Sequence, residues 1–454
     1  MRIVVIGAGY VGLNCGAAFA YLGHEVGIVE KDPARVALLR SGGVPIHEPG
    51  LAELLAMPQV AARMTYTTDL AEVLPGARVA LIAVGTPPGK HGQADTGWVE
   101  AAAEDVARDL AVGAQLVIVV KSTVPVGTNH RVQAAVARVL ASRGVTCDVS
   151  FASNPEFLRE GKALLDMFYP DRILVGSESS HALETARELY QEVLTQSFAP
   201  PPICPRPIGF ALPAMLTTST ASAEMTKYAS NAFLATKISF INEIAGLCER
   251  VGADVSQVAD GMGLDARIGR GFLQAGLGWG GSCFPKDTQA LIAMGADHEY
   301  TMPLLEASTA VNRRQRAQVV QKLQRALKGL RGREVGLLGL AFKAGTDDVR
   351  QAPAADLVQM LLECGAFVRA HDPVAADAFR RDYPSLDVTL TPDAEAAARG
   401  ADALVVCTDW PEYVALDWRA VAAAMRGSVV VDGRNCLPTG VVRAAGLDLI
   451  RIGK

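Results

Sequence analysis

The segment that most constrains the fold is a glycine pattern near the start of the chain, running from Gly7 to Gly12 as GAGYVG. An apolar run at 2–6 precedes it and predicts a buried strand, and an alanine-rich stretch at 13–22 follows it and predicts a helix. A second strand, predicted at 25–30, ends on the acid Glu30. A strand, a glycine turn, a helix and a strand closing on an acid form a βαβ unit of the kind that binds dinucleotides.

Each glycine in this pattern has a physical reason. Gly7 allows a tight turn, Gly9 lets the backbone approach a pyrophosphate, and Gly12 lets the helix pack closely. The start of the helix favours the phosphate charge. The carboxylate of Glu30 can accept from both ribose hydroxyls, which favours NAD over NADP, although Lys31 follows it directly. The alternative is a turn of an α/β protein that binds nothing.

Strand and helix patterns then alternate along most of the chain. Further buried strands are predicted at 79–84, 116–120, 173–175, 333–340, 366–370, 403–407 and 429–431. Between the two groups of strands, residues 222–251 contain one glycine and no proline, which predicts a long helix. We therefore predict an α/β fold with two Rossmann-like, doubly wound lobes joined by a long central helix.

The expected domain boundaries follow from this alternation. We place a dinucleotide-binding domain at 1–210, a central helical domain at 211–328 and a second Rossmann-like domain at 329–454. A proline-rich stretch at 199–207 predicts a surface loop at the first boundary. The segment 199–218 as a whole has no role that the sequence assigns.

Composition excludes several classes of function. The formal net charge of −5 gives no basic surface for nucleic acid, and no apolar run is long enough to predict a membrane span. The first residues enter a strand without the pattern of a signal peptide. The eight cysteines are scattered, as expected of thiols in a reducing compartment, so we expect a cytoplasmic protein. No histidines lie at metal-binding spacing, and we predict no metal site.

One cysteine stands in an unusual context. Cys283 lies in a glycine-dense segment at 278–287, with Lys286 and Asp287 directly after it. A thiolate attacks carbonyl carbons, and nearby positive charge lowers the pKa of a thiol. A nicotinamide cofactor together with a reactive cysteine suggests oxidation of an alcohol through an aldehyde and a thioester to a carboxylate. The alternative is an inert core cysteine, which is the interpretation we keep for the other seven.

Polar residues follow several of the predicted strands. Thr86 and Thr123 lie just after two strands, where hydroxyls can meet cofactor or substrate, or can simply cap turns. Glu156 and Glu160 are four residues apart and would share one side of a helix, where a carboxylate can act as a base. They can equally be a solvated pair.

On the long central helix, Lys227 and Asn231 are also four residues apart. A desolvated lysine can polarise an oxygen or lose its proton. A solvated surface charge is the simpler alternative for any single lysine on a helix, so this pair matters only in combination with the other motifs.

Taken in order, these segments resemble the UDP-glucose/GDP-mannose dehydrogenase family. The matching runs span almost the whole chain and are GAGYVG, PIHEPGL (45–51), VGTPP, KSTVPVGT, SNPEFLREG (153–161), AEMTKYASNAFLATKISFINEIA (223–245), GWGGSCFPKD, GLAFKAGTDDVR (339–350) and DGRN (432–435). The segment 265–269 resembles the branch that acts on UDP-glucose. Glu30 stands where that family usually has an aspartate, and the segment 199–218 looks longer than usual.

Family members oxidise a nucleotide sugar twice at C6, with two NAD and one water. The resemblance therefore implies NAD-dependent, four-electron oxidation of UDP-glucose to UDP-glucuronate, through a thiohemiacetal and a thioester on Cys283. The third domain would bind the UDP-sugar. Two alternatives stay open: the same chemistry on GDP-mannose or a UDP-N-acetylhexosamine, and a catalytically silent NAD-binding regulator.

The resemblance also implies roles for single residues. Catalytic roles fall on Cys283, Glu156, Thr123, Lys227, Asn231 and Asp287. Substrate contacts fall on Glu160, Phe157, Leu158, Arg267, Phe272, Gly280, Lys343 and Arg434. With the glycine pattern, cofactor contacts fall on Gly7, Gly9, Tyr10, Val11, Gly12, Glu30, Gly85, Thr86, Thr123, Lys286 and Arg350.

Finally, the long helix predicts a homodimer or a higher homo-oligomer. Its apolar residues are too many for one narrow stripe, so more than one side must be buried, and a partner subunit can cover the second side. The resemblance implies that Arg267 reaches the substrate of the neighbouring subunit. We expect a small nucleotide sugar as the other partner, with no nucleic acid and no membrane.

Overall fold

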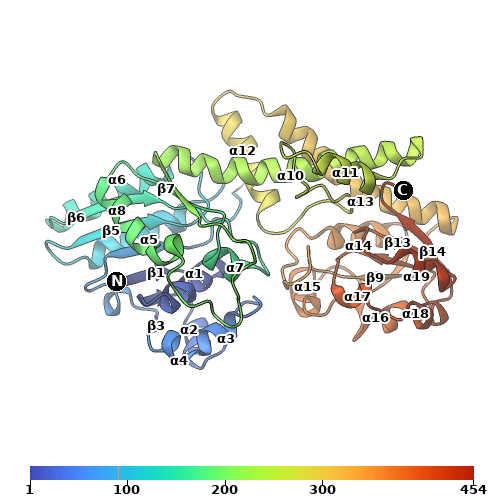
Figure 1. Cartoon of the computed structure of the whole chain (residues 1–454), viewed down its shortest axis with the longest axis horizontal. Helices are drawn as coiled ribbons and strands as arrows, with labels where there is room; N and C mark the ends of the chain where they lie inside the picture. The colour runs from blue at the N-terminus through green and yellow to red at the C-terminus, as the bar shows by residue number, and fades with distance from the viewer. Residues whose placement is uncertain (90–91) are drawn as a thin grey trace. The chain divides into compact units, whose positions relative to one another are not determined.

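The structure is a computed structural model that describes residues 1–89 and 92–454. The chain forms two compact units, Met1–Ser230 (unit 1) and Asn231–Lys454 (unit 2), coloured blue to green and green to red in Figure 1. The division falls inside the long helix α10 (Thr220–Val251), which contributes to both units. The three-domain division at 210 and 328 stays a prediction.

Unit 1 is built on one eight-stranded sheet in the order β3-β2-β1-β4-β5-β6-β7-β8. Its strands are β1 (Arg2–Ile6), β2 (Glu25–Val29), β3 (Met64–Thr67), β4 (Val79–Ile82), β5 (Gln115–Val120), β6 (Asp148–Ser153), β7 (Arg172–Gly176) and β8 (Ala214–Thr218). All neighbours pair in parallel except β6 and β7. The order in which strands are added to the sheet reverses between β1 and β4. Sheets of this kind bind ligands at such a point.

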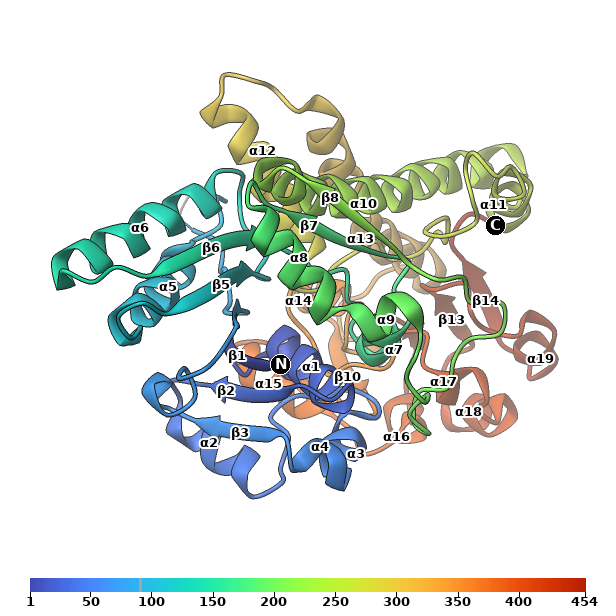
Figure 2. The same cartoon turned by 60° about the vertical axis from the view of Figure 1, so that its left-hand side comes forward.

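Helices cover both faces of this sheet because successive strand residues point to opposite sides. Ile3 and Val5 pack in one core with α1, whereas Val4 and Ile6 pack in another with α5 and α6. Figure 2 shows α5 and α6 side by side. The helices of unit 1 before α10 are α1 (Tyr10–Tyr21), α2 (Pro33–Arg40), α3 (Leu51–Ala56), α4 (Pro58–Ala61), the 3₁₀ turn η1 (Leu70–Glu72), α5 (Gly97–Asp109), α6 (Thr128–Arg143), α7 (Ala163–Phe168), α8 (Ser180–Leu189) and α9 (Gln191–Thr195).

Unit 2 contains a second, fully parallel sheet in the order β11-β10-β9-β12-β13-β14. The strands are β9 (Glu334–Leu338), β10 (Phe367–His371), β11 (Val388–Leu390), β12 (Ala403–Val406), β13 (Val429–Asp432) and β14 (Asp448–Arg451). The helices are the rest of α10, α11 (Val255–Gly263), α12 (Phe284–Asp297), α13 (Pro303–Leu327), α14 (Pro353–Glu363), α15 (Ala376–Asp382), α16 (Ala394–Ala398), α17 (Pro411–Val414), α18 (Trp418–Ala424) and α19 (Thr439–Ala444).

This architecture confirms the predicted fold class. Two doubly wound sheets are present, and α10 spans the predicted long helix at 222–251 with two further residues at its start. The strand order of unit 2 repeats that of the first six strands of unit 1. The first helix begins at Tyr10, earlier than the predicted residue 13, because Gly9 already serves as its N-cap.

Glu156 and Glu160 do not share a helix face, which was the condition for pairing them. Residues 154–162 form no helix, and α7 begins only at Ala163. Pro155 disfavours helical geometry at the residue before it. The Glu156 carboxylate instead accepts from the backbone N–H of Leu158 at 2.6 Å, a local bond that competes with a helix.

The proline-rich stretch is a loop, as predicted, and it is anchored to unit 1. No helix or strand is present between α9 and β8. Phe210 packs edge-on against Tyr169, whose hydroxyl donates to the carbonyl of Cys204 at 3.1 Å. Ile208 and Leu212 remain exposed on this loop.

Among the described residues, no helix is long and apolar enough to cross a bilayer. The same residues include no group of three histidine, cysteine, aspartate or glutamate side chains placed to hold a metal ion. No disulfide joins the cysteines in the part of the chain that the structure describes.

Candidate active site

The glycine loop of unit 1 has the geometry that its sequence predicts. Gly7 adopts φ +104°, in the left-handed region, and its N–H donates to the carbonyl of Val29 at 2.8 Å. A Cβ on Gly12 would lie 1.9 Å from the carbonyl oxygen of Gly7, so only glycine fits there. A Cβ on Gly9 would meet nothing within 4 Å, which leaves the start of α1 open to a phosphate.

Glu30 lies beside this loop. Its carboxylate accepts from the N–H of Ala8 at 3.0 Å and from that of Asp32 at 3.1 Å, and Arg35 lies 3.9 Å away. A ribose at the end of β2 would therefore find an oriented acid next to an open helix start. The residues present fit a dinucleotide.

Two more loops meet at the neighbouring strand ends. The hydroxyl of Thr86, after β4, donates to the carbonyl of Thr123, after β5, at 2.9 Å. Ser122 donates to the carbonyl of Val84 at 2.6 Å. The structure thus brings the two predicted threonine loops together at the ends of β4 and β5, next to the reversal point of the sheet.

Glu156 is buried and paired. Its carboxylate lies 3.0 Å from the ammonium of Lys227 on α10, and the two side chains are 8% and 5% exposed. The other carboxylate oxygen accepts a hydrogen bond from the backbone N–H of Leu158. Two predicted catalytic residues that are far apart in the sequence are therefore in contact, in a setting where water screens charge weakly.

The ring of the next residue, Phe157, contacts two cations. The guanidinium of Arg172 lies 3.9 Å from the centre of its ring, and the ammonium of Lys227 lies 5.3 Å from it. Such contacts stabilise an aromatic ring in one orientation. Glu160, further along, is partly exposed.

Sequence reasoning missed Glu48. Its side chain is in a residue only 6% exposed and accepts from the Tyr10 hydroxyl at 2.5 Å and from the backbone N–H groups of Gly161 and Ala163 at 2.7 Å each. The signal was available, because Glu48 is the acid in the run 45–51 that helped to identify the resemblance. Nothing local in that run indicates its partners.

Sequence reasoning also missed Glu224, in the first turns of α10. Its buried carboxylate accepts from the N–H groups of Gly127 and Asn129 at 2.7 and 2.9 Å, and from the side-chain amide of Asn129 at 2.9 Å. Burial raises the pKa of Glu224 although these donors oppose the shift. The bonds tie α10 to the start of α6, and so to the loop that follows β5.

In unit 2, Asn231 and Asp287 are in contact. The amide nitrogen of Asn231 donates to one oxygen of Asp287 at 2.6 Å, and the ammonium of Lys286 lies 2.6 Å from the other. Asp287 is 1% exposed, so its carboxylate fixes the orientation of the amide inside the protein. Asn231 follows Lys227 by four residues along α10, which places both on one side of that helix.

Cys283 is the N-cap residue of α12. The N–H of Asp287 donates to its carbonyl at 2.8 Å, and the hydroxyl of Ser282 lies 3.5 Å from its sulfur. The first turn of a helix presents unpaired N–H groups and a partial positive charge, and the backbone places Cys283 at that end of α12.

The backbone before Cys283 is held at successive residues. Gly276 donates to the side-chain oxygen of Asn242 at 2.8 Å, and Leu277 donates to the carbonyl of Gly433 at 2.9 Å. Trp279 donates to Asn312 at 2.8 Å through its backbone. Its indole is buried and donates to Ser239 at 2.9 Å, so the ring is part of the core.

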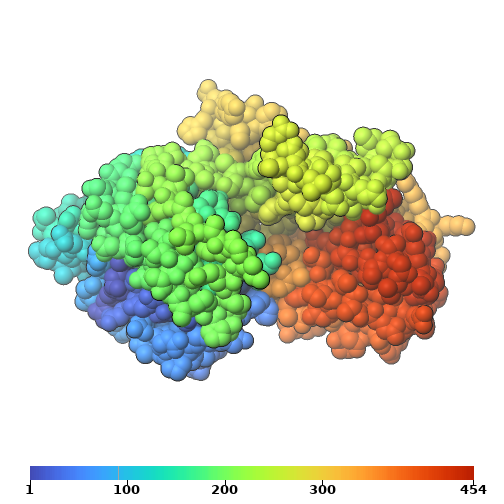
Figure 3. Space-filling model, viewed as in Figure 1, coloured from blue at the N-terminus to red at the C-terminus, as the bar shows by residue number. Residues whose placement is uncertain are grey.

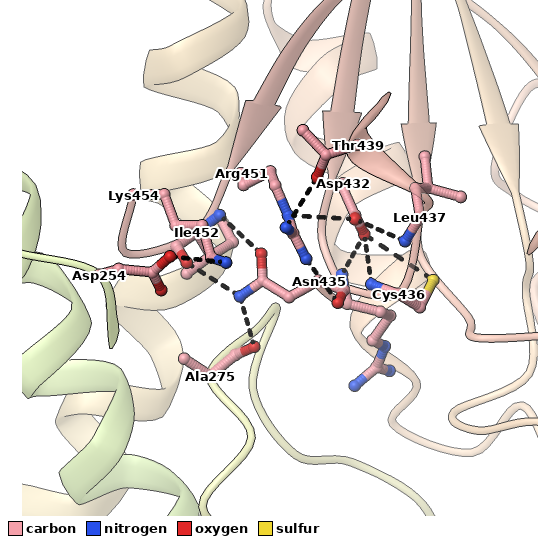
Figure 4. A network of polar contacts seen from close by, with 11 residues as sticks. Asp254, Ala275, Asp432, Asn435, Cys436, Leu437, Thr439, Arg451, Ile452 and Lys454 are labelled. Atoms are coloured by element: carbon pink, nitrogen blue, oxygen red, sulfur yellow. Dashed lines mark hydrogen bonds and ion pairs between the residues drawn. The ribbon is translucent and has the colours of Figure 1, made fainter. Parts of the chain in front are cut away.

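The loop after β13 is equally fixed, as Figure 4 shows. Asp432 is fully buried and accepts from the N–H groups of Cys436 and Leu437 at 3.2 and 2.9 Å. Asn435, at φ +55°, bonds the carbonyl of Ile452 at 2.9 Å.

Arg434, predicted to contact substrate, donates to three backbone carbonyls in this structure. These belong to Cys407 at 2.6 Å, Gly278 at 3.3 Å and Phe342 at 2.8 Å. Arg434 therefore fastens the cysteine loop to two loops of the second sheet, and a substrate contact stays a prediction.

Two of the remaining predicted substrate residues, Phe272 and Gly280, have an unusual or crowded backbone. Phe272 is at φ +64°, an unusual conformation for an aromatic residue, and its ring lies 6.1 Å from that of Phe284 at the start of α12. A Cβ on Gly280 would lie 2.2 Å from the carbonyl oxygen of Gln351, so backbone packing alone demands this glycine.

The charged residues of unit 2 that were predicted to contact substrate or cofactor are more exposed to solvent. Arg267 has a side chain 87% exposed and pairs with Asp265 at 2.6 Å; the yellow segment that contains both lies at the surface in Figure 3. Arg350 pairs with Asp348 at 2.7 Å. The ammonium of Lys343 lies 5.3 Å from the ring centre of its neighbour Phe342. None of these contacts tests a role in binding.

Comparison with known proteins places these features in one family. Residues 1–194 match the NAD binding domain, 221–314 the central domain and 336–439 the UDP binding domain of the UDP-glucose/GDP-mannose dehydrogenase family.

Curated relatives agree over the whole chain. The chain is 46% identical to UDP-glucose 6-dehydrogenase of Pseudomonas aeruginosa, over 96% of this chain and 93% of the relative. It is 44% identical to UDP-glucose 6-dehydrogenase TuaD of Bacillus subtilis, over 100% and 93%. A solved UDP-glucose dehydrogenase from Pyrobaculum islandicum superposes with a TM-score of 0.86 at 40% identity, over 99% of this chain and 96% of that one. The chain belongs to the UDP-glucose/GDP-mannose dehydrogenase family and is an NAD-dependent oxidoreductase.

Proposed function

We propose that the protein oxidises UDP-glucose to UDP-glucuronate in two NAD-dependent steps, with the intermediate held on Cys283. The observation that carries the proposal is the cysteine at the start of α12, with Asp287 one turn further along that helix and bonded to Asn231 of α10. The high identity to UDP-glucose 6-dehydrogenases over the full chain supports the choice of sugar.

In the first step, the C6 hydroxyl of the sugar loses its proton to water and C6 loses a hydride, which leaves an aldehyde. NAD, when bound, supplies the acceptor for the hydride. Lys227 and Asn231 present an ammonium and an amide from one side of α10 to the C6 oxygen. Each such donor stabilises a developing oxyanion by about 3 kcal/mol. Asp287 orients the amide, because it accepts one of the two N–H bonds of Asn231.

In the second step, the thiolate of Cys283 adds to the aldehyde carbon and forms a thiohemiacetal. This species is itself an alcohol, so it loses its hydroxyl proton to water and a second hydride, for which a second NAD would be the acceptor, and becomes a thioester. The covalent bond means that the aldehyde need never leave the protein.

Water then hydrolyses the thioester. Glu156 acts as the base that takes a proton from this water, with Thr123 as a further polar group, and the contact with Lys227 orients the carboxylate. Sulfur leaves, UDP-glucuronate is released, and Cys283 returns to its starting form.

We assign the predicted substrate contacts to recognition of UDP-glucose: Glu160, Phe157, Leu158, Arg267, Phe272, Gly280, Lys343 and Arg434. The predicted cofactor contacts, from the glycine loop to Arg350, are assigned to NAD. Hydrogen bonds to neighbouring loops support this assignment for Tyr10, Glu30 and Thr86.

We also propose a homodimer or higher homo-oligomer in the cytoplasm. Phe233, Phe240 and Leu247 follow one another at seven-residue spacing on α10 and are exposed in the single chain, which favours a partner helix on that side. The scattered cysteines without disulfides favour a reducing compartment.

The direct test is an NADH assay over a panel of nucleotide sugars: UDP-glucose, GDP-mannose and UDP-N-acetylhexosamines. UDP-glucose should give two NADH per sugar consumed, and NAD should be preferred to NADP because of Glu30. One NADH with free aldehyde would contradict the four-electron chemistry. A different sugar as the preferred substrate would overturn the choice of UDP-glucose, and no turnover with any sugar would favour a silent regulator.

A further inference from the structure

The run at 45–51 has no part in the chemistry described above, yet it contains a buried carboxylate with well-defined partners. Glu48 accepts three hydrogen bonds of 2.5 to 2.7 Å, one from the hydroxyl of Tyr10 and two from the backbone of Gly161 and Ala163. An ionised side chain accepts stronger hydrogen bonds than a neutral one does, so these bonds fix the relative positions of their donors.

The donors belong to two different ligand sites. Tyr10 is the first residue of α1 and directly follows Gly9, where the pyrophosphate of the cofactor is expected. Gly161 lies near the end of the irregular segment 154–162, and Ala163 is the first residue of α7; the segment contains Glu156 and the predicted substrate residues Phe157, Leu158 and Glu160. A single carboxylate therefore joins the cofactor loop to the end of the substrate segment.

A second contact reinforces the same connection. The hydroxyl of Tyr10 also lies 3.2 Å from the carbonyl oxygen of Arg159, inside the substrate segment. Arg159 is itself fixed, because its guanidinium and backbone N–H both bond Asp166 on α7, at 2.6 and 2.8 Å. Movement at either end of this arrangement has to change the other.

The phenol remains a donor at every physiological pH. Burial, the hydrogen bond to Glu48 and the charges of Glu48, Glu160 and Glu156 all raise the pKa of Tyr10 above its ordinary value. The connection through Glu48 thus persists unless the loops themselves move.

We propose that Glu48 is a positioning residue that couples cofactor binding at the glycine loop to nucleotide-sugar binding at segment 154–162. Cofactor phosphates that settle at the start of α1 order Tyr10, Tyr10 orders Glu48, and Glu48 orders the substrate segment. The second ligand then meets a segment that is already in place, which gives positive coupling between the two sites. The assignment of segment 154–162 to the sugar rests on the proposed function.

The test measures binding without turnover. NADH and UDP-glucose form a complex that cannot react, because the reduced cofactor accepts no hydride. Calorimetry gives the dissociation constant of UDP-glucose with and without saturating NADH, and the ratio of the two constants is the coupling factor. We expect a factor of about 5 or more for the native protein.

The decisive variant is Glu48→Gln, which keeps the size of the side chain but removes its charge and points an N–H group at a donor. Its coupling factor should fall to about 1. Tyr10→Phe keeps the carboxylate and its two backbone bonds and removes only the connection to the glycine loop, so its factor should fall in the same way. The double variant should lower the factor no further, because both changes break one connection. Glu53→Gln, an exposed acid on α3, is the matched control and should keep the native factor.

Contrary outcomes are distinct. A factor near 1 in the native protein, or a native factor in both Glu48→Gln and Tyr10→Phe, overturns the coupling. If Glu48→Gln does not fold, Tyr10→Phe alone decides. Failure of UDP-glucose to bind the native protein at all contradicts the proposed substrate instead, and the measurement is then made with the sugar that the NADH panel identifies.

Discussion

Replacing Glu156 by glutamine should stop the reaction at its last step. In the structure one carboxylate oxygen lies 3.0 Å from the ammonium of Lys227, and the other accepts from Leu158 at 2.6 Å. Glutamine has the same shape, and its amide oxygen can keep the bond to Leu158. It cannot take a proton from water. A general base contributes about 10²- to 10⁴-fold in rate, which corresponds to about 3–5 kcal/mol of barrier.

The two hydride steps do not need this base, so they should stay fast. Stopped-flow measurement should show a burst of two NADH per active site, followed by turnover about 10² to 10⁴ times slower than native. Intact mass measurement during the slow phase should find the acyl group on Cys283. A melting curve compares the fold of the variant with that of the native protein.

Glu160→Gln is the comparison variant, since Glu160 is only four residues away and is less buried than Glu156. It should accumulate no adduct. Native turnover of Glu156→Gln without an adduct would refute the assignment of the base, and an adduct in Glu160→Gln instead would transfer that role to Glu160.

Three other perturbations test separate parts of the reasoning. Cys283→Ser should lose steady-state turnover and retain at most trace oxidation, because a hydroxyl is a far weaker nucleophile than a thiolate; full NADH production by this variant would exclude the covalent route. Mixed Cys283→Ser and Arg267→Ala protomers, each inactive alone, should regain activity if Arg267 serves the neighbouring site, and no rescue despite proven subunit exchange would refute it. Burial and the amino terminus lower the pKa of His24 to about 4, so the unfolded chain binds more protons as pH falls from about 6.5 to 4 and stability is lost in that window. Urea midpoints at pH 7 and pH 5 should differ less for His24→Phe than for the native protein, and an equal difference would exclude His24 as a cause.

The fold could be predicted because its signals are local. A glycine turn between an apolar run and an alanine-rich stretch sets the first βαβ unit, and steric reasons confine Gly7 and Gly12 to glycine. The long helix follows from a stretch almost without helix breakers. At 154–162 the four-residue spacing of two acids did not indicate the local structure. Pro155 and the hydrogen bond from Leu158 to the side chain of Glu156 favour an irregular segment there.

The polar connections could not be predicted from one sequence. Glu48 meets a backbone 113 residues later in the chain, and Glu224 meets one 95 residues earlier. Hydrogen bonds to backbone N–H groups place no demand on the identity of the donor residue, so the sequence gives no matching signal at the other end. The loop that precedes Cys283 is held in the same way, by backbone groups and by asparagines that are ordinary in composition.

The two sheets together show why similar topology supports different ligands. In unit 1, Gly7 at φ +104° donates to the end of β2, and the acid there, Glu30, accepts from the turn and keeps an edge open for a ribose. In unit 2, Gly339 at φ +102° donates to the end of β10 in the same way, and Asp372 follows that strand. Asp372 is buried.

Its two oxygens already accept from five donors, namely the N–H groups of Leu340, Ala341, Val374 and Ala375 and the indole of Trp410. A carboxylate with five donors stabilises the surrounding loops and has no lone pair left to accept from the two hydroxyls of a ribose. The repeated strand order therefore preserves the turn and its acid in both sheets, but only the first sheet keeps the acid available for a dinucleotide. The two sheets share one strand order but differ at this acid, because Glu30 accepts from two backbone N–H groups and Asp372 accepts from five donors.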